Sequence, residues 1–281
     1  MARYVPDILT HRWVVISPQR LHRSIDEVVK RSSRTHKGTI FCEGNEHLTP
    51  PEVLRYGDGE ANKPGWKVRV IPNKYPITDY HEIIIHSPDP VRDIEKLPLP
   101  QVKLILRAYR ERYNFYREKG QVLIFCNHGL HAGASIDHPH SQLVVLPFQI
   151  NLDTVTREPL NNIVETKKYL SAYCPDFSQW PYEMWIVPNN EQTVFGSITD
   201  DELEELAGMM HRALKRLEEI YPKYRMSDLP MGYNFYIYPK KNWYMRLIPR
   251  LVHRAGFELG TGLSVNVVDP ADAAEAYRGH M

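Results

Sequence analysis

The segment with the most potential chemistry is Asn127–Pro147, which reads NHGLHAGASIDHPHSQLVVLP. It holds four histidines within thirteen residues, at positions 128, 131, 138 and 140. Side chains of an extended chain repeat every two residues, so His138, His140 and Gln142 are expected on one side. Pro139 restricts the backbone between the two imidazoles. The pattern predicts a row of two imidazoles and one amide along a strand.

A neutral imidazole nitrogen is a competent nucleophile toward phosphorus. Its attack on the α-phosphorus of a nucleotide would give a nucleotidyl-histidine and release a phosphate-bearing product. The amide of Gln142 can donate to phosphoryl oxygens without changing its charge, and so can the backbone of the glycine-containing turn Ala132–Ser135. The histidine pair is also compatible with a metal site. His128 and His131 are equally consistent with loop residues exposed to water.

Two long helices and several short strands must position this segment. Apolar residues at helical spacing predict helices over Gln101–Lys119 and Asp200–Tyr221, the second with Thr199 as its N-cap. Dense or alternating apolar residues predict strands at 66–71, 81–86, 122–126, 142–146, 183–187, 233–238 and 244–248. The polar stretch Ser24–Gly65 is expected to be rich in loops.

The order of these elements repeats along the chain. In each half a strand is followed by a loop, a long helix and two strands joined by a tight loop, beginning at HEIIIHSP and at YEMWIVP. Strands joined by short turns pair antiparallel. The sequence therefore predicts an α+β fold with a duplicated unit, in which long helices pack on a mainly antiparallel sheet. The two halves are expected at residues 1–150 and 151–281.

Charge and composition exclude several classes of protein. The chain has 281 residues, 35 Lys and Arg, 34 Asp and Glu, and a formal net charge of +1. This balance provides no field for binding nucleic acid or an anionic membrane surface. No apolar run approaches the roughly 18 residues of a membrane span, and the N-terminus lacks the pattern of a signal peptide. With three scattered cysteines, a cytoplasmic protein is expected.

The motif HPHSQ at 138–142 resembles the active-site motif of the galactose-1-phosphate uridylyltransferase family, within the histidine triad superfamily. Further segments resemble the family in the same order: YVPDILTHRWVVISPQRLHRS, FCEGNEHLTPPEV, WKVRVIPNKYPIT, YHEIIIHSPD and FELGTGLSVNVVDPADAAE. The resemblance covers most of the chain. It implies a duplicated histidine-triad-like unit, a homodimer, and an enzyme that acts on a nucleotide sugar and a sugar phosphate.

The resemblance also implies roles for individual residues. His140 matches the nucleophile that forms the nucleotidyl-enzyme. Gln142 replaces the third histidine of triad hydrolases, which favours transfer over hydrolysis. Substrate contacts are implied for Arg20, Arg23, Asn73, Asn127, Gly133, Ser135 and His138. The two arginines are also consistent with a solvated strand end, and Asn73 with turn chemistry.

The default reaction is that of a UDP-glucose:galactose-1-phosphate uridylyltransferase. An ADP-sugar phosphorylase or a dinucleoside polyphosphate phosphorylase would use the same chemistry. A hydrolase and a non-catalytic nucleotide-binding relative are the remaining alternatives, because the chain departs from the family's pattern in both halves.

The first departure concerns a structural zinc, which the family usually holds with two cysteines, a histidine after the SPD turn and the first histidine of the HPH motif. Thr39 and Pro90 occupy two of these positions here, which leaves Cys42 and His138. Two ligands do not make a closed tetrahedral site, so neither zinc nor any cofactor is predicted. His138 is then expected to orient its loop by hydrogen bonding. The second departure is the strand NWYMRLIP, which replaces a tryptophan–histidine-rich strand and indicates a degenerate second site.

Overall fold

The computed structural model describes residues 2–6, 13–18, 20, 39–150, 152, 160–223 and 231–280. The chain forms two compact units assembled from interleaved segments. Unit 1 comprises Met1–Arg92, Leu104–Ile124 and Ser135–Val155, and unit 2 comprises Asp93–Lys103, Phe125–Ala134 and Thr156–Met281. The division into halves at residues 1–150 and 151–281 stays a prediction.

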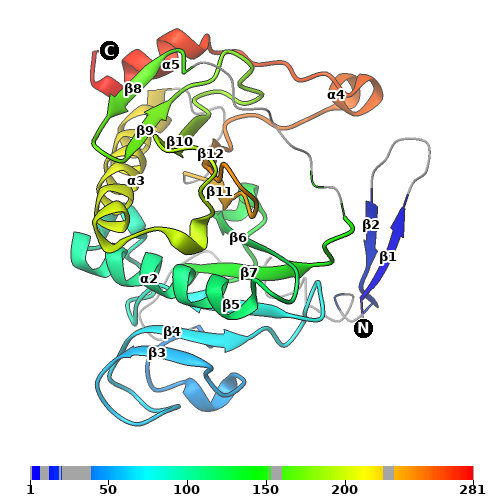
Figure 1. Cartoon of the computed structure of the whole chain (residues 1–281), viewed down its shortest axis with the longest axis vertical. Coiled ribbons are helices and arrows are strands. Elements are labelled where there is room, and N and C mark those ends of the chain that lie inside the picture. Colours follow the sequence, from blue (N-terminus) through cyan, green and yellow to red (C-terminus); the bar gives the residue numbers. More distant parts are fainter. Residues whose placement is uncertain are drawn as a thin grey trace. The chain divides into compact units, whose positions relative to one another are not determined.

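Unit 1 is built on an antiparallel array of buried strands. The strands β3 (Leu54–Gly57), β4 (Trp66–Pro72), β5 (His81–Ile85) and β7 (His140–Leu146) lie side by side in this order (Figure 1). The next strand, β6 (Gln121–His128), begins in this unit. A separate hairpin pairs β1 (Arg3–Pro6) with β2 (Trp13–Ile16). The central strands are rich in β-branched residues and almost wholly buried, as expected of strands covered on both faces.

The strand register brings chemistry-bearing residues to one face. Ile71 of β4 lies opposite Ile83 of β5, which lies opposite Gln142 of β7. Ile85 lies opposite His140 in the same way. Because side chains alternate between the two faces of a strand, these residues share one face of the array.

The other face is covered by α2 (Leu99–Tyr116), of which the residues from 104 onward belong to unit 1. Tyr109 makes a hydrogen bond to the hydroxyl of Ser141. Arg112 makes a buried ion pair with Glu82, with 2.6 Å between Nη2 and Oε1. These contacts fix the helix to β5 and β7 and leave the opposite face of the strands to His140 and Gln142.

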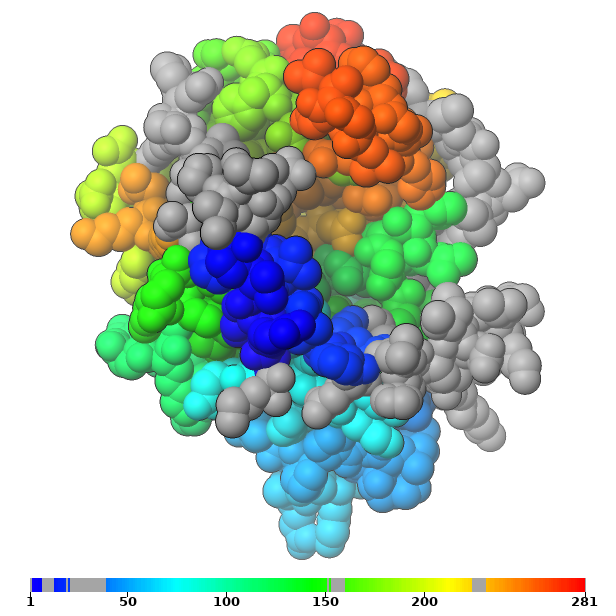
Figure 2. Space-filling view, turned by 90° about the vertical axis from the view of Figure 1, so that its right-hand side faces the viewer, coloured from blue at the N-terminus to red at the C-terminus, as the bar shows by residue number. Residues whose placement is uncertain are grey.

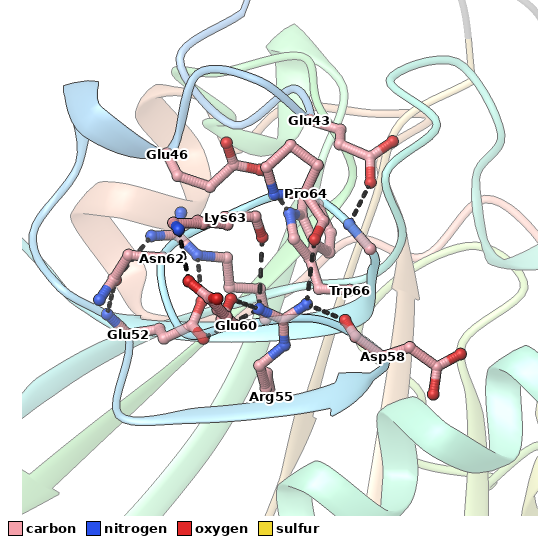
Figure 3. Close-up of polar contacts among 12 residues, drawn as sticks. Glu43, Glu46, Glu52, Arg55, Asp58, Glu60, Asn62, Lys63, Pro64 and Trp66 are labelled. Carbon is pink, nitrogen blue, oxygen red and sulfur yellow. Dashed lines mark hydrogen bonds and ion pairs between the residues drawn. The ribbon is translucent and has the colours of Figure 1, made fainter.

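The hairpin between β3 and β4 is organised around one guanidinium group (Figure 3). The Arg55 side chain donates hydrogen bonds to backbone carbonyls of Asp58, Glu60, Lys63 and Pro64. Beside it, Arg69 donates from Nε to Glu52 Oε2 at 2.8 Å and from Nη1 to Thr49 Oγ1 at 2.9 Å. The two arginines therefore connect the hairpin to the chain segment that carries Thr49.

Unit 2 contains a second antiparallel array. Its strands lie in the order β11 (Tyr233–Ile237), β12 (Met245–Pro249), β10 (Met184–Pro188), β9 (Leu170–Tyr173) and β8 (Ile163–Thr166). The long helix α3 (Asp200–Ile220) begins with a capping box, in which Thr199 and Glu202 each accept the other's backbone N–H. Its apolar stripe is buried and includes Leu203, Leu206, Leu214 and Leu217.

The C-terminal part of unit 2 holds α4 (Gly256–Thr261) and α5 (Pro270–Arg278). Several apolar side chains around α4, orange in Figure 2, are exposed, namely Phe257, Leu259, Leu263 and Val267. In contrast, Tyr277 of α5 is buried, and its hydroxyl donates to the carbonyl of Tyr182 at 2.9 Å. Within the described residues, no helix is both long and apolar enough to cross a membrane.

The predicted α+β class with antiparallel pairing is confirmed. The elements β5, α2, β6 and β7 recur in kind and order as β10, α3, β11 and β12. In each set the third strand pairs with the first, as β7 does with β5 and β12 with β10. Periodicity and propensity did not predict the short elements β1, β2, β3, β8, β9, α4 and α5. Of these, β3 lies inside the stretch expected to be rich in loops.

Candidate active site

Unit 1 contains a cavity of about 230 Å³ on the face of the sheet that carries His140. Five of its lining residues are predicted site residues: Arg20, Asn73, Ser135, His140 and Gln142. Much of the remaining wall is apolar and includes Ile40, Leu48, Pro50, Ile71, Ile83 and Ile136. An apolar pocket with a few convergent polar groups is typical of a small-molecule site.

His140 is the first residue of β7, and contacts within unit 1 hold its ring in place. Its Nδ1 lies 2.8 Å from the backbone carbonyl oxygen of His138. A carbonyl oxygen only accepts, so Nδ1 carries the proton and the lone pair of the neutral ring lies on Nε2. Phe41 packs edge-on against the ring, with 5.4 Å between centroids. The backbone thus selects the tautomer that makes Nε2 nucleophilic.

Two amides line the cavity beside this ring, and both contact one further histidine. Gln142 Oε1 lies 3.0 Å from His81 Nε2, and Asn73 Nδ2 lies 3.1 Å from the same nitrogen. Asn73 Oδ1 also accepts the backbone N–H of Tyr75 at 2.8 Å. The sequence analysis did not select His81 as a site residue. His81 lies two residues before Ile83 on β5, and this spacing indicates that the two side chains share the cavity face.

An arginine and a serine also line the cavity. Arg20 Nη1 donates to the carbonyl of Tyr75 at 3.2 Å, which directs the guanidinium along the cavity wall. Partial burial lowers the pKa of Arg20 below its ordinary value, yet an arginine remains charged near neutral pH. Ser135 contributes its hydroxyl from the segment before the HPHSQ motif. These groups suit an anionic ligand such as a phosphoryl group.

His138 precedes β7, which begins at His140. Its Nε2 donates to the carbonyl of Ser87 at 2.8 Å, so its Nδ1 is an acceptor. The hydroxyl of Thr39 donates to that Nδ1 at 3.0 Å and lies 3.2 Å from Cys42 Sγ. His138 is thus enclosed by hydrogen-bonding groups, and the expected row of three side chains stays a prediction.

The residues around His138 do not fit a structural zinc. They offer one thiol and one imidazole, whereas a closed site needs four ligands, and the Thr39 hydroxyl uses the nitrogen that a metal would take. His81 contacts Gln142, and His86 contacts Ser141 Oγ at 2.7 Å, so neither completes the set. In the part of the chain that the structure describes, no three His, Cys, Asp or Glu side chains form a metal-binding group.

The remaining predicted contacts do not belong to the described part of unit 1. Arg23 lies outside the described residues. Asn127 and Gly133 belong to unit 2, where Asn127 Oδ1 accepts from Asn234 Nδ2 at 2.8 Å. Gly133 has φ of +81° and ends a short turn, a conformation that favours glycine. In the same unit, His128 stacks on Tyr233 and lies 3.2 Å from an Asp93 oxygen, so it is not a water-exposed loop residue.

Comparison with known proteins agrees with this fold. The family model described as "Galactose-1-phosphate uridyl transferase, N-terminal domain" matches residues 77–148. An ADP-glucose phosphorylase of Arabidopsis thaliana is 26% identical over 97% of this chain and 91% of its own length. A galactose-1-phosphate uridylyltransferase of Thermotoga maritima is 22% identical over 98% of this chain and 97% of its own length.

Among solved structures, the crystal structure of an ADP-glucose phosphorylase from Arabidopsis thaliana with bound ADP-glucose matches with a TM-score of 0.73. It is 24% identical, and the match covers 99% of both chains. The fold, the family model matched at residues 77–148 and these relatives make the chain similar to galactose-1-phosphate uridylyltransferases and to ADP-glucose phosphorylase. This similarity indicates a nucleotidyltransferase enzyme.

Proposed function

We propose that this protein moves a nucleoside monophosphate from a nucleotide sugar to a phosphate acceptor through a nucleotidyl-His140 intermediate. The observation that carries the proposal is the placement of His140 at a cavity with its Nδ1 bonded to the carbonyl of His138. That contact leaves the lone pair on Nε2. A nucleophile with a fixed tautomer beside groups suited to phosphate is what nucleotidyl transfer requires.

In the first step, His140 Nε2 attacks the α-phosphorus of the nucleotide sugar. The Nε2–P bond forms, and the bond from that phosphorus to the bridging oxygen breaks. The sugar 1-phosphate leaves with the electron pair of the broken bond. The ring gains positive charge as it is nucleotidylated, and the His138 carbonyl oxygen, which accepts the hydrogen bond from Nδ1, stabilises that charge.

Charge on the phosphoryl oxygens needs stabilisation during the same step. Arg20, Gln142 and the Ser135 hydroxyl are positioned on the cavity wall to provide it. We extend the proposal to Arg23, Asn127 and Gly133 as further substrate contacts. Gln142 has no titratable proton and so is a poor general base for water, which favours an intermediate that survives until an acceptor arrives.

In the second step, a phosphate oxygen of the acceptor attacks the same phosphorus and His140 is regenerated. With a sugar 1-phosphate as acceptor, the enzyme is a uridylyltransferase of the UDP-glucose and galactose 1-phosphate type. With inorganic phosphate, it is an ADP-sugar phosphorylase, a candidate favoured by the similarity to a plant ADP-glucose phosphorylase over 97% of the chain. The proposal includes a homodimer and a cytoplasmic location.

Intact-protein mass spectrometry tests this proposal. After incubation with UDP-glucose or ADP-glucose separately, the mass should rise by one uridylyl or adenylyl group, which also identifies the base. His140→Ala should show no gain, and galactose 1-phosphate or inorganic phosphate should discharge the wild-type intermediate. A mass gain retained in His140→Ala would overturn the assignment. Release of nucleoside monophosphate without acceptor would indicate a hydrolase, and binding without any gain a non-catalytic relative.

A further inference from the structure

We infer that His81 is a positioning residue, which fixes the amide of Gln142 as a hydrogen-bond donor toward the phosphoryl group of the substrate. This inference rests on the proposed nucleotidyl transfer and deepens it. His81 is the first residue of β5, is buried, and shares the cavity face of unit 1 with Ile83.

The protonation pattern of His81 follows from a backbone contact. Its Nδ1 lies 2.9 Å from the backbone N–H of Ile77, and a backbone N–H only donates. Nδ1 must therefore hold a lone pair, and the proton of the neutral ring is on Nε2. A second proton on Nδ1 would face the Ile77 N–H, so this contact also disfavours the charged ring.

This tautomer determines which way the Gln142 amide faces. The His81 Nε2–H donates to Gln142 Oε1 over 3.0 Å, which holds the amide oxygen toward His81 and away from a ligand. The amide nitrogen then faces the other way with two hydrogens to donate. A glutamine amide has nearly the same shape after a half-turn, so without His81 it could instead present its oxygen to a phosphoryl oxygen and repel it.

The second amide at the cavity, that of Asn73, is oriented by the backbone rather than by His81. The Asn73 oxygen accepts the Tyr75 N–H, so Nδ2 is the atom that faces His81 at 3.1 Å. Because His81 Nε2 carries a proton, it cannot accept from Nδ2. His81 therefore orients the Gln142 donor alone, and as a neutral imidazole it adds no charge to the site.

Two substitutions separate this role from a purely structural one. His81→Met keeps side-chain bulk but removes the donor, whereas the amide nitrogen of His81→Gln can take the place of Nε2. With a nucleotide sugar labelled at the α-phosphate, we expect the single-turnover rate of enzyme labelling to fall on the order of 10- to 100-fold in His81→Met. The KM for the nucleotide sugar should change less than about 3-fold, because the orienting effect is greatest in the transition state. His81→Gln should recover most of the rate.

A double-mutant cycle shows whether His81 acts through the Gln142 amide. In a Gln142→Ala background, His81→Met should cause little further loss, because the amide that His81 orients is absent. The matched control is His86→Met, which removes another buried imidazole directly after β5 that contacts Ser141 rather than the cavity. It should lower the thermal midpoint but leave the labelling rate within about 3-fold.

The outcomes separate this inference from the proposed function. If the wild-type enzyme forms no covalent nucleotidyl adduct, both proposals are overturned. If the wild type is labelled but His81→Met is labelled equally fast, only the role of His81 is overturned. A full additional loss in the Gln142→Ala background, or an equal loss in His86→Met, would also overturn it. Should His81→Met fail to fold, His81→Asn, whose amide is too short to reach Gln142, replaces it in every comparison.

Discussion

The strands β7 and β12 follow the same kind of helix and pair with the same kind of strand, each within its own unit, yet they carry different chemistry. β7 presents His140 and Gln142 to a cavity. β12 instead carries Arg246, which donates from Nε and Nη2 to the Glu183 carboxylate at 2.7 and 2.9 Å. His140 and Gln142 of β7 therefore face a cavity, whereas Arg246 of β12 forms a buried ion pair.

The surroundings of Arg246 explain why β12 is a structural strand. Trp185 Nε1 donates to the same carboxylate at 2.7 Å, and Tyr244 stacks on that indole with 4.1 Å between centroids. Burial alone would lower the pKa of Arg246, but the charge and hydrogen bonds of Glu183 raise it above its ordinary value. Unit 2 thus repeats the order and pairing of the elements of unit 1, but its strand β12 carries a buried ion pair where β7 carries groups that face a cavity.

The largest effect is expected from breaking the ion pair on β12. Arg246→Met should lower the free energy of unfolding by about 3–5 kcal/mol, because it leaves the Glu183 carboxylate buried without a counter-charge. Urea unfolding measures this loss. The double variant Arg246→Met, Glu183→Leu should recover much of it. Enzyme labelling by a nucleotide sugar should stay within about 2-fold of wild type in the folded protein, and a tenfold loss would show that β12 takes part in the chemistry.

A second test uses a carboxylate of unit 2. Burial and the nearby Asp93 raise the pKa of Glu95 to about 7, although His128 opposes the shift. Between roughly pH 4.5 and 7 the unfolded chain loses this proton while the folded chain keeps it, so folding becomes less favourable as the pH rises. The contribution is about 3 kcal/mol over that window. Glu95→Gln should therefore gain stability relative to wild type as the pH rises from 4.5 to 8. If the free energies of unfolding of the two proteins changed equally with pH, the raised pKa of Glu95 would be contradicted.

The smallest effect is expected at the hydrogen bonds around His138 in unit 1. Thr39→Val removes the hydroxyl that donates to His138 Nδ1 and leaves this buried acceptor with the weaker contact to Cys42 Sγ at 3.8 Å, which should cost about 1–2 kcal/mol. Thr39→Ser keeps the hydroxyl and is the matched control. Thermal unfolding distinguishes the two variants. Equal midpoints would mean that this hydroxyl does not support the loop before β7.

Local patterns accounted for much of the fold. The helix predicted over Asp200–Tyr221 is observed over Asp200–Ile220 with Thr199 as its cap, because helical periodicity and capping are local properties. The strand predicted from Gln142 begins two residues earlier, at His140. The short strands β3, β8 and β9 were missed because each is stabilised by pairing with a neighbour rather than by its own pattern.

The sequence indicated which residues line the site, but it did not indicate the contacts between them. The sequence indicated His140, Gln142, Arg20, Asn73 and Ser135, and all of these line one cavity. Their catalytic and binding roles stay predictions. The tautomer of His81 depends on the Ile77 backbone, a contact made by the fold, so spacing alone could not indicate a role for it. The expected row of three side chains stays a prediction, because His138 lies outside β7 and strand periodicity does not apply to it.

The hairpin around Arg55 has a practical consequence for handling the protein. Residues 57–65 are exposed and include several glycines, which would ordinarily mark a good place to insert a tag or a probe. Here the loop closes around one guanidinium through its own backbone carbonyls (Figure 3). An added segment between Glu60 and Lys63 would separate those carbonyls and disturb the neighbouring Arg69–Thr49 contact at the cavity rim. This accessible loop is therefore a poor insertion site.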